Sequence, residues 1–334
     1  MIDKRNKGRK ELFEDEVFPK NSTSLGKWDK LDKLIESTNS ERKWKNLKPV
    51  KIEWIRVPDL PHLNLTSKQT PHVYFSDAKN SAYRFKQGKL GNCWFCAVGS
   101  TLSDYYELIS KSNRDIQNVK SSRFTSEEYL GIFHFRFYHL GVWNDVVIDD
   151  YLPTLEGQLI FAHSKDPNEF WPALLEKAYA KFLGSYAALD GGCPLDAALH
   201  FSGGFSQSYE LSKYQTEDQI QELFQCLISA TTKCSKSSIV TCSTYNFGDE
   251  KGEESKILGL KPSHAYTFTK VFRHKSVQLV RLRNPWGGDE WMGAWSDYSD
   301  EMKSLSYFEK EKLGIDIEDD GEFHMEMKDF VKVI

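Results

Sequence analysis

Cysteine is scarce in this sequence. Its 334 residues include only six cysteines, which are Cys93, Cys96, Cys193, Cys226, Cys234 and Cys242. They show none of the close, regular spacing that marks a disulfide framework. Few cysteines in a long chain are typical of a reducing compartment, so we expect an intracellular, cytoplasmic protein.

Two further features are missing: a strong charge of one sign and a long apolar run. The 44 Lys and Arg residues nearly balance the 48 Asp and Glu residues, and the net charge of -4 argues against a nucleic-acid-binding protein. No stretch reaches the roughly 18 consecutive apolar residues of a membrane span. The basic N-terminus, MIDKRNKGRK, is followed by no apolar segment, so we expect no signal peptide.

Apolar and aromatic residues, in contrast, are plentiful. Hydrophobic residues make up 40% of the chain, and nine Trp with 21 Phe can fill a sizeable core. Residues 1–75 are polar and punctuated by proline, which predicts an irregular N-terminal arm with short helical pieces. The pair Gly191-Gly192 interrupts the pattern that follows. It predicts a hinge between two subdomains, residues 76–191 and residues 192–334.

Hydrophobic periodicity predicts an α+β fold whose first half is mainly helical and whose second half is mainly antiparallel β. The expected helices are residues 93–111, 168–183 and 216–230. The expected strands are residues 131–139 and 142–149, which alternate as a β-hairpin, and residues 238–243, 264–272 and 277–284. Asn168 is the expected N-cap of the second helix, and Thr216 with Gln219 forms a capping-box pattern for the third.

Residues 87–94, QGKLGNCW, combine a glutamine, two glycines and a Cys-Trp pair at the start of an apolar helical pattern. A thiol in the first turn of a helix faces the positive end of the helix dipole, which lowers the pKa of the thiol. We therefore interpret Cys93 as a nucleophile. Such a nucleophile needs a base, a residue that orients the base, and an oxyanion donor.

Among nine histidines, His264 has the context that best suits a base. It opens a predicted strand beside small residues, and Asn284 ends the next strand. Two antiparallel strands joined by a short turn can bring the two residues side by side. The Asn284 carbonyl can then accept a hydrogen bond from the imidazole, shielded by Trp286. Spacing alone leaves a purely structural role for His264 open.

Three blocks of sequence stand out: QGKLGNCW at 87–94, HAY at 264–266 and RLRNPWG at 281–287. Together they resemble the signature of the calpain cysteine proteases. Further calpain-like blocks are LFED at 12–15, GIFHF at 131–135, DVVIDD at 145–150, NEFW at 168–171, LEKAYAK at 175–181 and AWSD at 294–297. Asn92 stands where conventional members have Asp, which resembles a non-conventional branch, and Ser263 replaces the usual Gly. Neither departure removes a catalytic atom.

The resemblance implies a papain-like protease core of two subdomains, with the active site in the cleft between them. Cys93 would attack the scissile carbonyl, and His264 would take and return the proton. Asn284 would orient His264. Gln87, with the Cys93 backbone N–H, would line the oxyanion hole.

The resemblance also implies Ca²⁺, which relatives bind in each subdomain. In the second subdomain the matching oxygen ligands are all present, and they are Glu290, Asp297, the Glu318 carbonyl, Asp320 and Glu322. In the first subdomain, Arg84 and Ala187 stand where the family places Asp and Glu ligands. We therefore expect one Ca²⁺ site, not two. An EF-hand starting at Asp316 is excluded because its twelfth position is Met327, while a plain solvated acidic turn remains an alternative.

We therefore predict a calcium-dependent intracellular cysteine endopeptidase that makes limited cuts in proteins. The expected partners are protein substrates and a protein inhibitor in the cleft. The alternative is a catalytically silent calpain-like scaffold or calcium-binding regulatory protein. Cys93 and Cys96 also form a C-x-x-C motif, but the βαβ context of a redox protein is missing, and no second pair completes a zinc site.

Overall fold

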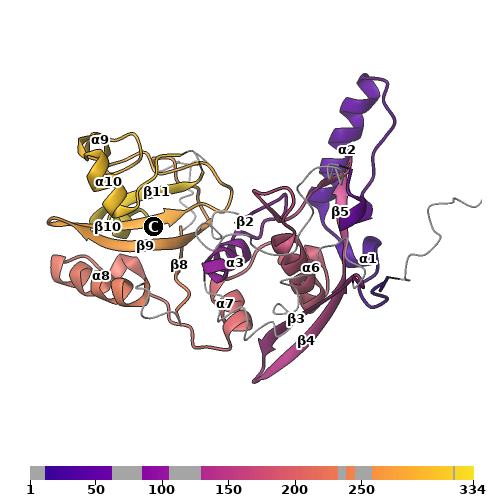
Figure 1. The fold of residues 1–334 in the computed structure, drawn as a ribbon, viewed down its shortest axis with the longest axis horizontal. Helices are drawn as coiled ribbons and strands as arrows, with labels where there is room; N and C mark the ends of the chain where they lie inside the picture. The colour runs from indigo at the N-terminus through magenta and orange to yellow at the C-terminus, as the bar shows by residue number, and fades with distance from the viewer. Residues whose placement is uncertain (1–11, 62–84, 105–128, 232–237, 245–257, 319) are drawn as a thin grey trace, which may run out of the picture. The chain divides into compact units, whose positions relative to one another are not determined.

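The computed structural model describes residues 12–61, 85–104, 129–231, 238–244, 258–318 and 320–334 (Figure 1). The chain divides into two compact units. Unit 1 comprises Met1–Ala78, Gly88–Leu90 and Ser110–Asp190, and unit 2 comprises Lys79–Gln87, Gly91–Ile109 and Gly191–Ile334. Among the helices in the described ranges, none has the length and apolar character needed to cross a bilayer.

The described part of unit 1 combines helices with two antiparallel β-structures. Its helical elements are α1 (Ser22–Leu25), α2 (Asp29–Trp44), η2 (Val57–Asp59), α6 (Trp171–Leu183) and η4 (Tyr186–Leu189). Its strands are β1 (Glu53–Arg56), β3 (Ile132–His139), β4 (Val142–Asp149), β5 (Tyr151–Leu155), β6 (Gln158–Leu159) and β7 (His163–Ser164). One sheet has the order β1-β5-β6, and β3 pairs with β4.

The β3–β4 hairpin is present as predicted, with Leu140 and Gly141 in its turn. Both turn residues have positive φ, 49° and 87°, which suits a two-residue hairpin loop. Alternate β3 side chains are buried, and they pack on helix α6. Phe135 stacks on Trp171 with ring centroids 5.9 Å apart, and the Phe137 ring lies 5.2 Å from that of Tyr179.

Helix α6 begins later than we expected. Its N-cap is Phe170, and Asn168 lies before the helix. The predicted cap is wrong because the Asp166 side chain accepts a hydrogen bond from the Asn168 backbone N–H at 2.9 Å. Such a local turn competes with helix formation. The helix ends at Gly184 in the left-handed conformation (φ 104°), as predicted.

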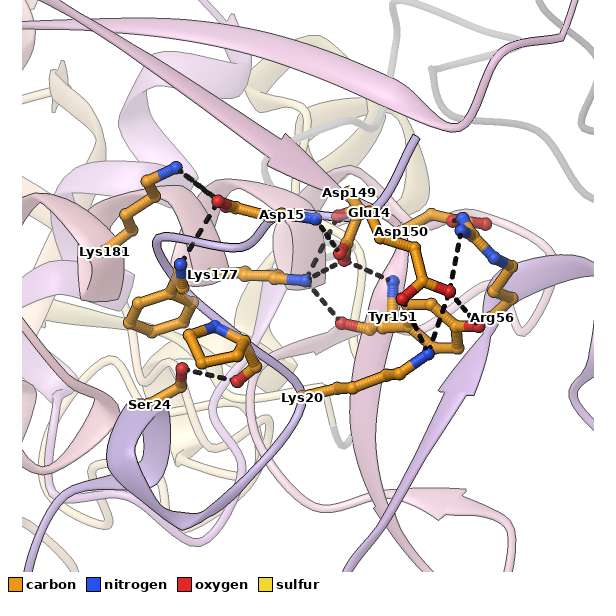
Figure 2. Close-up of polar contacts among 12 residues, drawn as sticks. Glu14, Asp15, Lys20, Ser24, Arg56, Asp149, Asp150, Tyr151, Lys177 and Lys181 are labelled. Atoms are coloured by element: carbon orange, nitrogen blue, oxygen red, sulfur yellow. Dashed lines mark hydrogen bonds and ion pairs between the residues drawn. The ribbon is translucent and has the colours of Figure 1, made fainter. Parts of the chain in front are cut away.

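A buried lysine lies at the centre of unit 1 (Figure 2). The Lys177 ammonium of α6 donates to the Asp149 carboxylate, to the Asp149 carbonyl at 3.2 Å and to the Tyr151 carbonyl at 2.7 Å. Burial lowers the pKa of Lys177, and the attraction of Asp149 opposes this shift only in part. Three acceptors thus satisfy all three ammonium protons.

The N-terminal strap, which we define as residues 12–18, is bound to this buried network (Figure 2). The Asp15 carboxylate accepts from Lys181 Nζ at 2.7 Å and from the Phe18 backbone N–H at 3.1 Å. The Asp15 backbone N–H donates to the Asp149 carboxylate at 2.8 Å. The strap therefore contributes charge to the interior of unit 1, and the buried Phe18 anchors its end.

Unit 2 is built on one antiparallel sheet with the strand order β11-β10-β9-β8. The described part of unit 2 contains the strands β2 (Phe85–Lys86), β8 (Thr241–Ser243), β9 (Ala265–His274), β10 (Val277–Arg283) and β11 (Glu322–Glu326). Its helical elements are α3 (Cys93–Asp104), α7 (Pro194–Ser202), η5 (Leu211–Lys213), α8 (Glu217–Thr231), α9 (Asp300–Ser304), α10 (Tyr307–Leu313) and α11 (Met327–Val333). The capping box of Thr216 and Gln219 at the start of α8 is confirmed.

Helices cover both faces of this sheet, with α8 on one side and α9 and α10 on the other (Figure 1). Val280 and Leu282 of β10 pack toward α8, whereas Leu279 packs with Met302 of α9. A bulge between Arg281 and Leu282 in the β9–β10 register adds one residue to β9. Bulges increase the local twist of a strand pair, and this one lies close to the strand ends that carry the candidate site.

Helix α3, which belongs to the predicted first subdomain of residues 76–191, packs inside compact unit 2. Its Phe95 ring lies 6.0 Å from that of Phe201 in α7, and the Thr267 hydroxyl of β9 donates to the Ala97 carbonyl at 2.9 Å. A Cβ at Gly192 would overlap the Trp94 ring, so this packing requires glycine. A division into compact units says nothing of hinge motion. The two predicted subdomains and the hinge between them therefore stay predictions.

Candidate active site

Cys93 is the first residue of helix α3, as predicted. The Asn92 carbonyl accepts from the backbone N–H groups of Phe95 and Cys96, each at 3.0 Å, and so begins the helix. The Asn92 side chain is fully buried and lies 3.5 Å from the Cys96 sulfur, which is also buried. Cys96 is therefore a core residue of this helix.

The resting thiol of Cys93 differs from our expectation. Burial raises its pKa, although the backbone N–H groups of Ala265, Trp94 and Cys93 itself lower it. The predicted lowering is wrong for this state because desolvation, which the sequence did not reveal, exceeds the effect of the helix start. The contact with Ala265 places Cys93 beside the residue that follows His264.

His264 and Asn284 are hydrogen-bonded, with 2.7 Å between Nε2 and Oδ1. The amide orientation is fixed independently. Asn284 Oδ1 also accepts from the Trp286 backbone N–H at 3.0 Å, and Nδ2 donates to the carbonyls of Gly288 and Asp289 at 2.6 and 3.1 Å. An amide oxygen can only accept, so Nε2 of His264 carries the proton and Nδ1 of the neutral ring is an acceptor.

Burial lowers the pKa of His264 to about 4. The hydrogen bond to Asn284 and the charge of Asp289 oppose this shift, whereas the charge of Lys261 adds to it. The imidazole is 3% exposed. Both pKa shifts favour the neutral form of the side chain, a thiol at Cys93 and an unprotonated imidazole at His264.

Trp286 connects the fourth predicted residue, Gln87, to this pair. The Trp286 ring centroid lies 4.5 Å from that of His264, and its Nε1–H donates to Gln87 Oε1 at 2.8 Å. The Gln87 backbone N–H donates to the Pro285 carbonyl at 3.0 Å. With Oε1 occupied in this way, the amide of Gln87 presents Nε2 as a donor.

All four predicted catalytic residues lie in unit 2, and the predicted placement of Gln87 and Cys93 on a first subdomain stays a prediction. The site also includes two residues that we did not predict. Tyr266 lies edge-on to His264 with ring centroids 5.0 Å apart. Lys261 forms an ion pair of 3.2 Å with Asp289. Tyr266 belongs to the HAY block of β9, whereas the position of Lys261 depends on the loop before β9, for which the sequence carried no signal.

The predicted Ca²⁺ ligands show part of the character of a cation site. Asp297 is buried, and among the described residues its Oδ1 has no hydrogen-bond partner. Burial and the neighbouring charge of Asp320 raise the pKa of Asp297 to about 6. Glu290 Oε1 accepts from the Gly321 backbone N–H at 2.9 Å. A buried carboxylate whose Oδ1 accepts no hydrogen bond from the described residues, with His324 Nδ1 3.9 Å away and a second acid nearby, fits a hard cation.

Glu322 fits less well than Asp297. Its carboxylate accepts from the Thr269 hydroxyl at 2.6 Å and lies 3.3 Å from Arg281. Within the described ranges, no group of three or more His, Cys, Asp or Glu side chains is placed to hold a metal ion. A cation would therefore have to draw the carboxylates together.

Of the two residues at which the Ca²⁺ site of the first subdomain was predicted to be lost, the structure describes only Ala187. This residue lies in η4 and carries no ligand oxygen on its side chain. Arg84 lies outside the described residues. The predicted loss of the first site thus stays a prediction.

Comparison with known proteins decides the family. The pattern of the family described as calpain family cysteine protease matches residues 13–334. The chain belongs to this family. It is 34% identical over 339 residues to calpain-5 of Mus musculus, an alignment that covers 97% of this chain and 48% of calpain-5. This calpain chain is thus, as its sequence predicted, an α+β cysteine protease core.

Two other relatives agree. The calpain-1 catalytic subunit of Rattus norvegicus is 36% identical over 326 residues, which cover 96% of this chain and 40% of that protein. Calpain-9 of Mus musculus is 40% identical over 248 residues, which cover 73% of this chain and 34% of calpain-9. The chain therefore spans about half, or less, of the length of these calpains.

Proposed function

We propose that this calpain chain is the catalytic part of a calcium-dependent, intracellular cysteine endopeptidase that makes limited cuts in proteins. The observation that carries the proposal is the His264–Asn284 hydrogen bond beside the thiol at the start of α3. Membership of a protease family implies protein substrates.

Cys93 supplies the nucleophile. As its sulfur attacks the scissile carbonyl carbon, Nδ1 of His264 accepts the thiol proton. The C–N bond then breaks, His264 returns the proton to the leaving amine, and the acyl group stays on sulfur as a thioester. Water, losing a proton to His264, hydrolyses the thioester and restores the thiol. Asn284 holds the imidazole in the tautomer that both steps need.

Gln87 supplies a donor for the oxyanion. Its Oε1 is held by the Trp286 indole, which supports a role for Nε2 as the donor to the tetrahedral intermediate. The backbone N–H of Cys93 is the second proposed donor. Loss of one such donor typically costs roughly 3–4 kcal/mol of transition-state stabilisation.

Calcium is the proposed regulator, with one site in residues 290–322. Asp297 carries this part of the proposal, with Glu290, the Glu318 carbonyl and Asp320 as further oxygen donors. Glu322 would first have to leave Thr269 and Arg281. Bound Ca²⁺ would supply the positive charge that these acidic groups lack.

Cleavage of an unstructured protein tests the proposal. We expect fragments to form only when Ca²⁺ is present, and none with Cys93→Ser under the same conditions. Cys242→Ser is the matched control, since Cys242 is a thiol of β8 without a proposed role, and it should cleave like the wild type. Equal cleavage by Cys93→Ser would contradict the thiol mechanism.

Calorimetry tests the metal separately. We expect one Ca²⁺ per chain, and weaker binding by at least tenfold in Asp297→Asn. Two comparable sites would overturn the predicted loss at Arg84 and Ala187. The alternative, a silent scaffold, predicts Ca²⁺ binding with no cleavage under any condition.

A further inference from the structure

Two charged residues face each other across the loops that carry His264 and Asn284. Lys261 lies in the loop before β9, and Asp289 lies in the loop after β10. The Lys261 ammonium is 3.2 Å from the Asp289 carboxylate. The lysine side chain is 18% exposed and the aspartate side chain 48%, so the pair is partly shielded from water.

Lys261 is fixed at both ends. Its backbone N–H donates to the Tyr266 hydroxyl at 2.9 Å, and the Tyr266 ring contacts His264. Its ammonium lies 5.5 Å from the centre of the Trp286 ring, within cation–π range. The other neighbour of that indole is the His264 ring, at 4.5 Å. The Trp286 indole therefore contacts both the Lys261 ammonium and the His264 imidazole.

Asp289 is coupled to Asn284 through the backbone. Asn284 Nδ2 donates to the carbonyl of Asp289 and to that of Gly288. Asp289 has a φ of 55°, a conformation that Asp and Asn tolerate better than most residues. A shift of this loop would move the two acceptors that hold the Asn284 amide, and with it the partner of His264.

We propose that Lys261 and Asp289 are positioning residues of the active site. Their ion pair, which we call the clasp, connects the loop before β9 to the loop after β10 and places two opposite charges near the His264 ring. The inference rests on the proposed function for the meaning of His264 as a base. The geometry of the clasp itself does not depend on that role.

The charges of the pair act on His264 in opposite directions. Lys261 lowers the pKa of His264, and Asp289 raises it. Among the described residues, Tyr266 also faces this ring, with ring centroids 5.0 Å apart, and the Cys93 thiol of α3 lies close enough to Tyr266 to affect its pKa. A residue that serves only to support the loops would not give effects of opposite sign.

Titration of the His264 ring by NMR tests the clasp in the full chain. All variants carry Cys93→Ser, so no turnover is needed, and the His264 signal is assigned by its loss in His264→Gln. We expect Lys261→Met to raise the pKa of His264 and Asp289→Asn to lower it. We expect shifts of roughly 0.2–0.7 pKa unit, because both charges are partly exposed and therefore screened by water. Asn retains the backbone conformation at position 289.

Two control variants test whether the effect is specific to the charge at position 261. Lys328→Met removes the same charge from another ion pair of unit 2, Lys328 with Glu326 at 2.8 Å, and should leave the titration unchanged. Lys261→Arg keeps the charge and should titrate like the parent. Shifts of the same sign in Lys261→Met and Asp289→Asn, or none in either, would overturn the proposal.

Kinetics then separate the clasp from the proposed function. With Cys93 restored, we expect Lys261→Met and Asp289→Asn to lower kcat more than they raise KM, and to move the acid limb of the pH profile in opposite directions. An enzyme with no cleavage at all, but with opposite shifts in the titration, would refute the proposed function and leave the clasp in place.

Discussion

At the scale of the residue, Asn284 is the most constrained polar side chain of the site. It is fully buried, and both ends of its amide are hydrogen-bonded. A fully satisfied amide cannot rotate without breaking several hydrogen bonds. The imidazole of His264 is therefore held in one tautomer and one plane before a substrate arrives.

We expect Asn284→Ala to lower kcat/KM by roughly 10–100-fold, because a hydrogen bond to a group that becomes charged is worth about 1.5–3 kcal/mol. Peptide hydrolysis by the purified variant measures this. The matched control is Asn144→Ala, which removes an amide that donates to the Phe137 carbonyl at 3.4 Å in the β3–β4 hairpin, and which should keep wild-type activity. Unchanged kcat/KM in Asn284→Ala would refute the orienting role.

Ser263 carries backbone strain directly before His264. Its φ of 49° lies in the left-handed region, where residues other than Gly cost about 1 kcal/mol or more. We expect Ser263→Gly to raise the free energy of unfolding by about 0.5–1 kcal/mol, measured by urea denaturation. A decrease would show that the greater freedom of Gly in the unfolded chain outweighs the relief of strain.

The sequence singled out candidate catalytic residues but not the environment of their side chains, and their catalytic roles stay predictions. Cys93, His264 and Asn284 could be named because the motif around each is short and local. The raised pKa of Cys93 could not be predicted, because it depends on burial of the thiol in the folded chain. The hydrogen bond from Trp286 to Gln87 joins residues 199 positions apart, and no local pattern encodes it.

At the scale of the element, the N-terminal strap brings a carboxylate into the interior of unit 1. Asp15 is 2% exposed at its side chain and pairs with Lys181 of α6, whereas the neighbouring Glu14 is 53% exposed (Figure 2). Removing one partner of a buried pair leaves the other charge uncompensated. The two adjacent acids should therefore differ sharply in their contribution to stability.

We expect Asp15→Asn to lower the free energy of unfolding by about 3–5 kcal/mol, and Glu14→Gln to lower it by less than about 1 kcal/mol. Urea denaturation of both variants gives the comparison. Similar losses in the two would show that the strap is held by its apolar anchor and that the buried ion pair contributes little.

Elements with strong local patterns were predicted well. The hairpin of β3 and β4, strands β9 and β10, and helix α8 lie where alternation or a capping box indicated. The strands missed are β1, β2, β5, β6, β7 and β11. β11 follows an acidic turn that looked solvent-exposed, and it is identified only by pairing with β10, a long-range contact.

At the scale of the whole molecule, buried histidines make the fold sensitive to acid. Burial lowers the pKa of His264 to about 4 and that of His324 to about 3. As the pH falls below about 6.5, the unfolded chain binds these protons first, so stability present above pH 6.5 is lost toward pH 4. Asp297, with its pKa raised to about 6, acts in the opposite sense and offsets part of the loss.

We therefore expect the free energy of unfolding to fall between pH 7.5 and pH 5, measured by urea denaturation at each pH. Each pKa unit corresponds to about 1.4 kcal/mol, so His264 alone gives roughly 2 kcal/mol over this range. His264→Gln should show a correspondingly weaker dependence on pH. Stability that rises as the pH falls to 5 would contradict the buried, neutral state of the two histidines.

We propose that Cys93 is the activated nucleophile of this calpain chain, and selective labelling of its thiol tests this directly. Cys193 and Cys226 are exposed, whereas Cys93 is partly buried, so accessibility alone favours the first two. The measurement is mass spectrometry of the intact chain and its peptides after brief treatment with a peptide-like, thiol-reactive epoxide, with and without Ca²⁺. We expect a single adduct on Cys93 that forms in the presence of Ca²⁺ and is lost in His264→Gln. Adducts on Cys193 and Cys226 with none on Cys93 would contradict it.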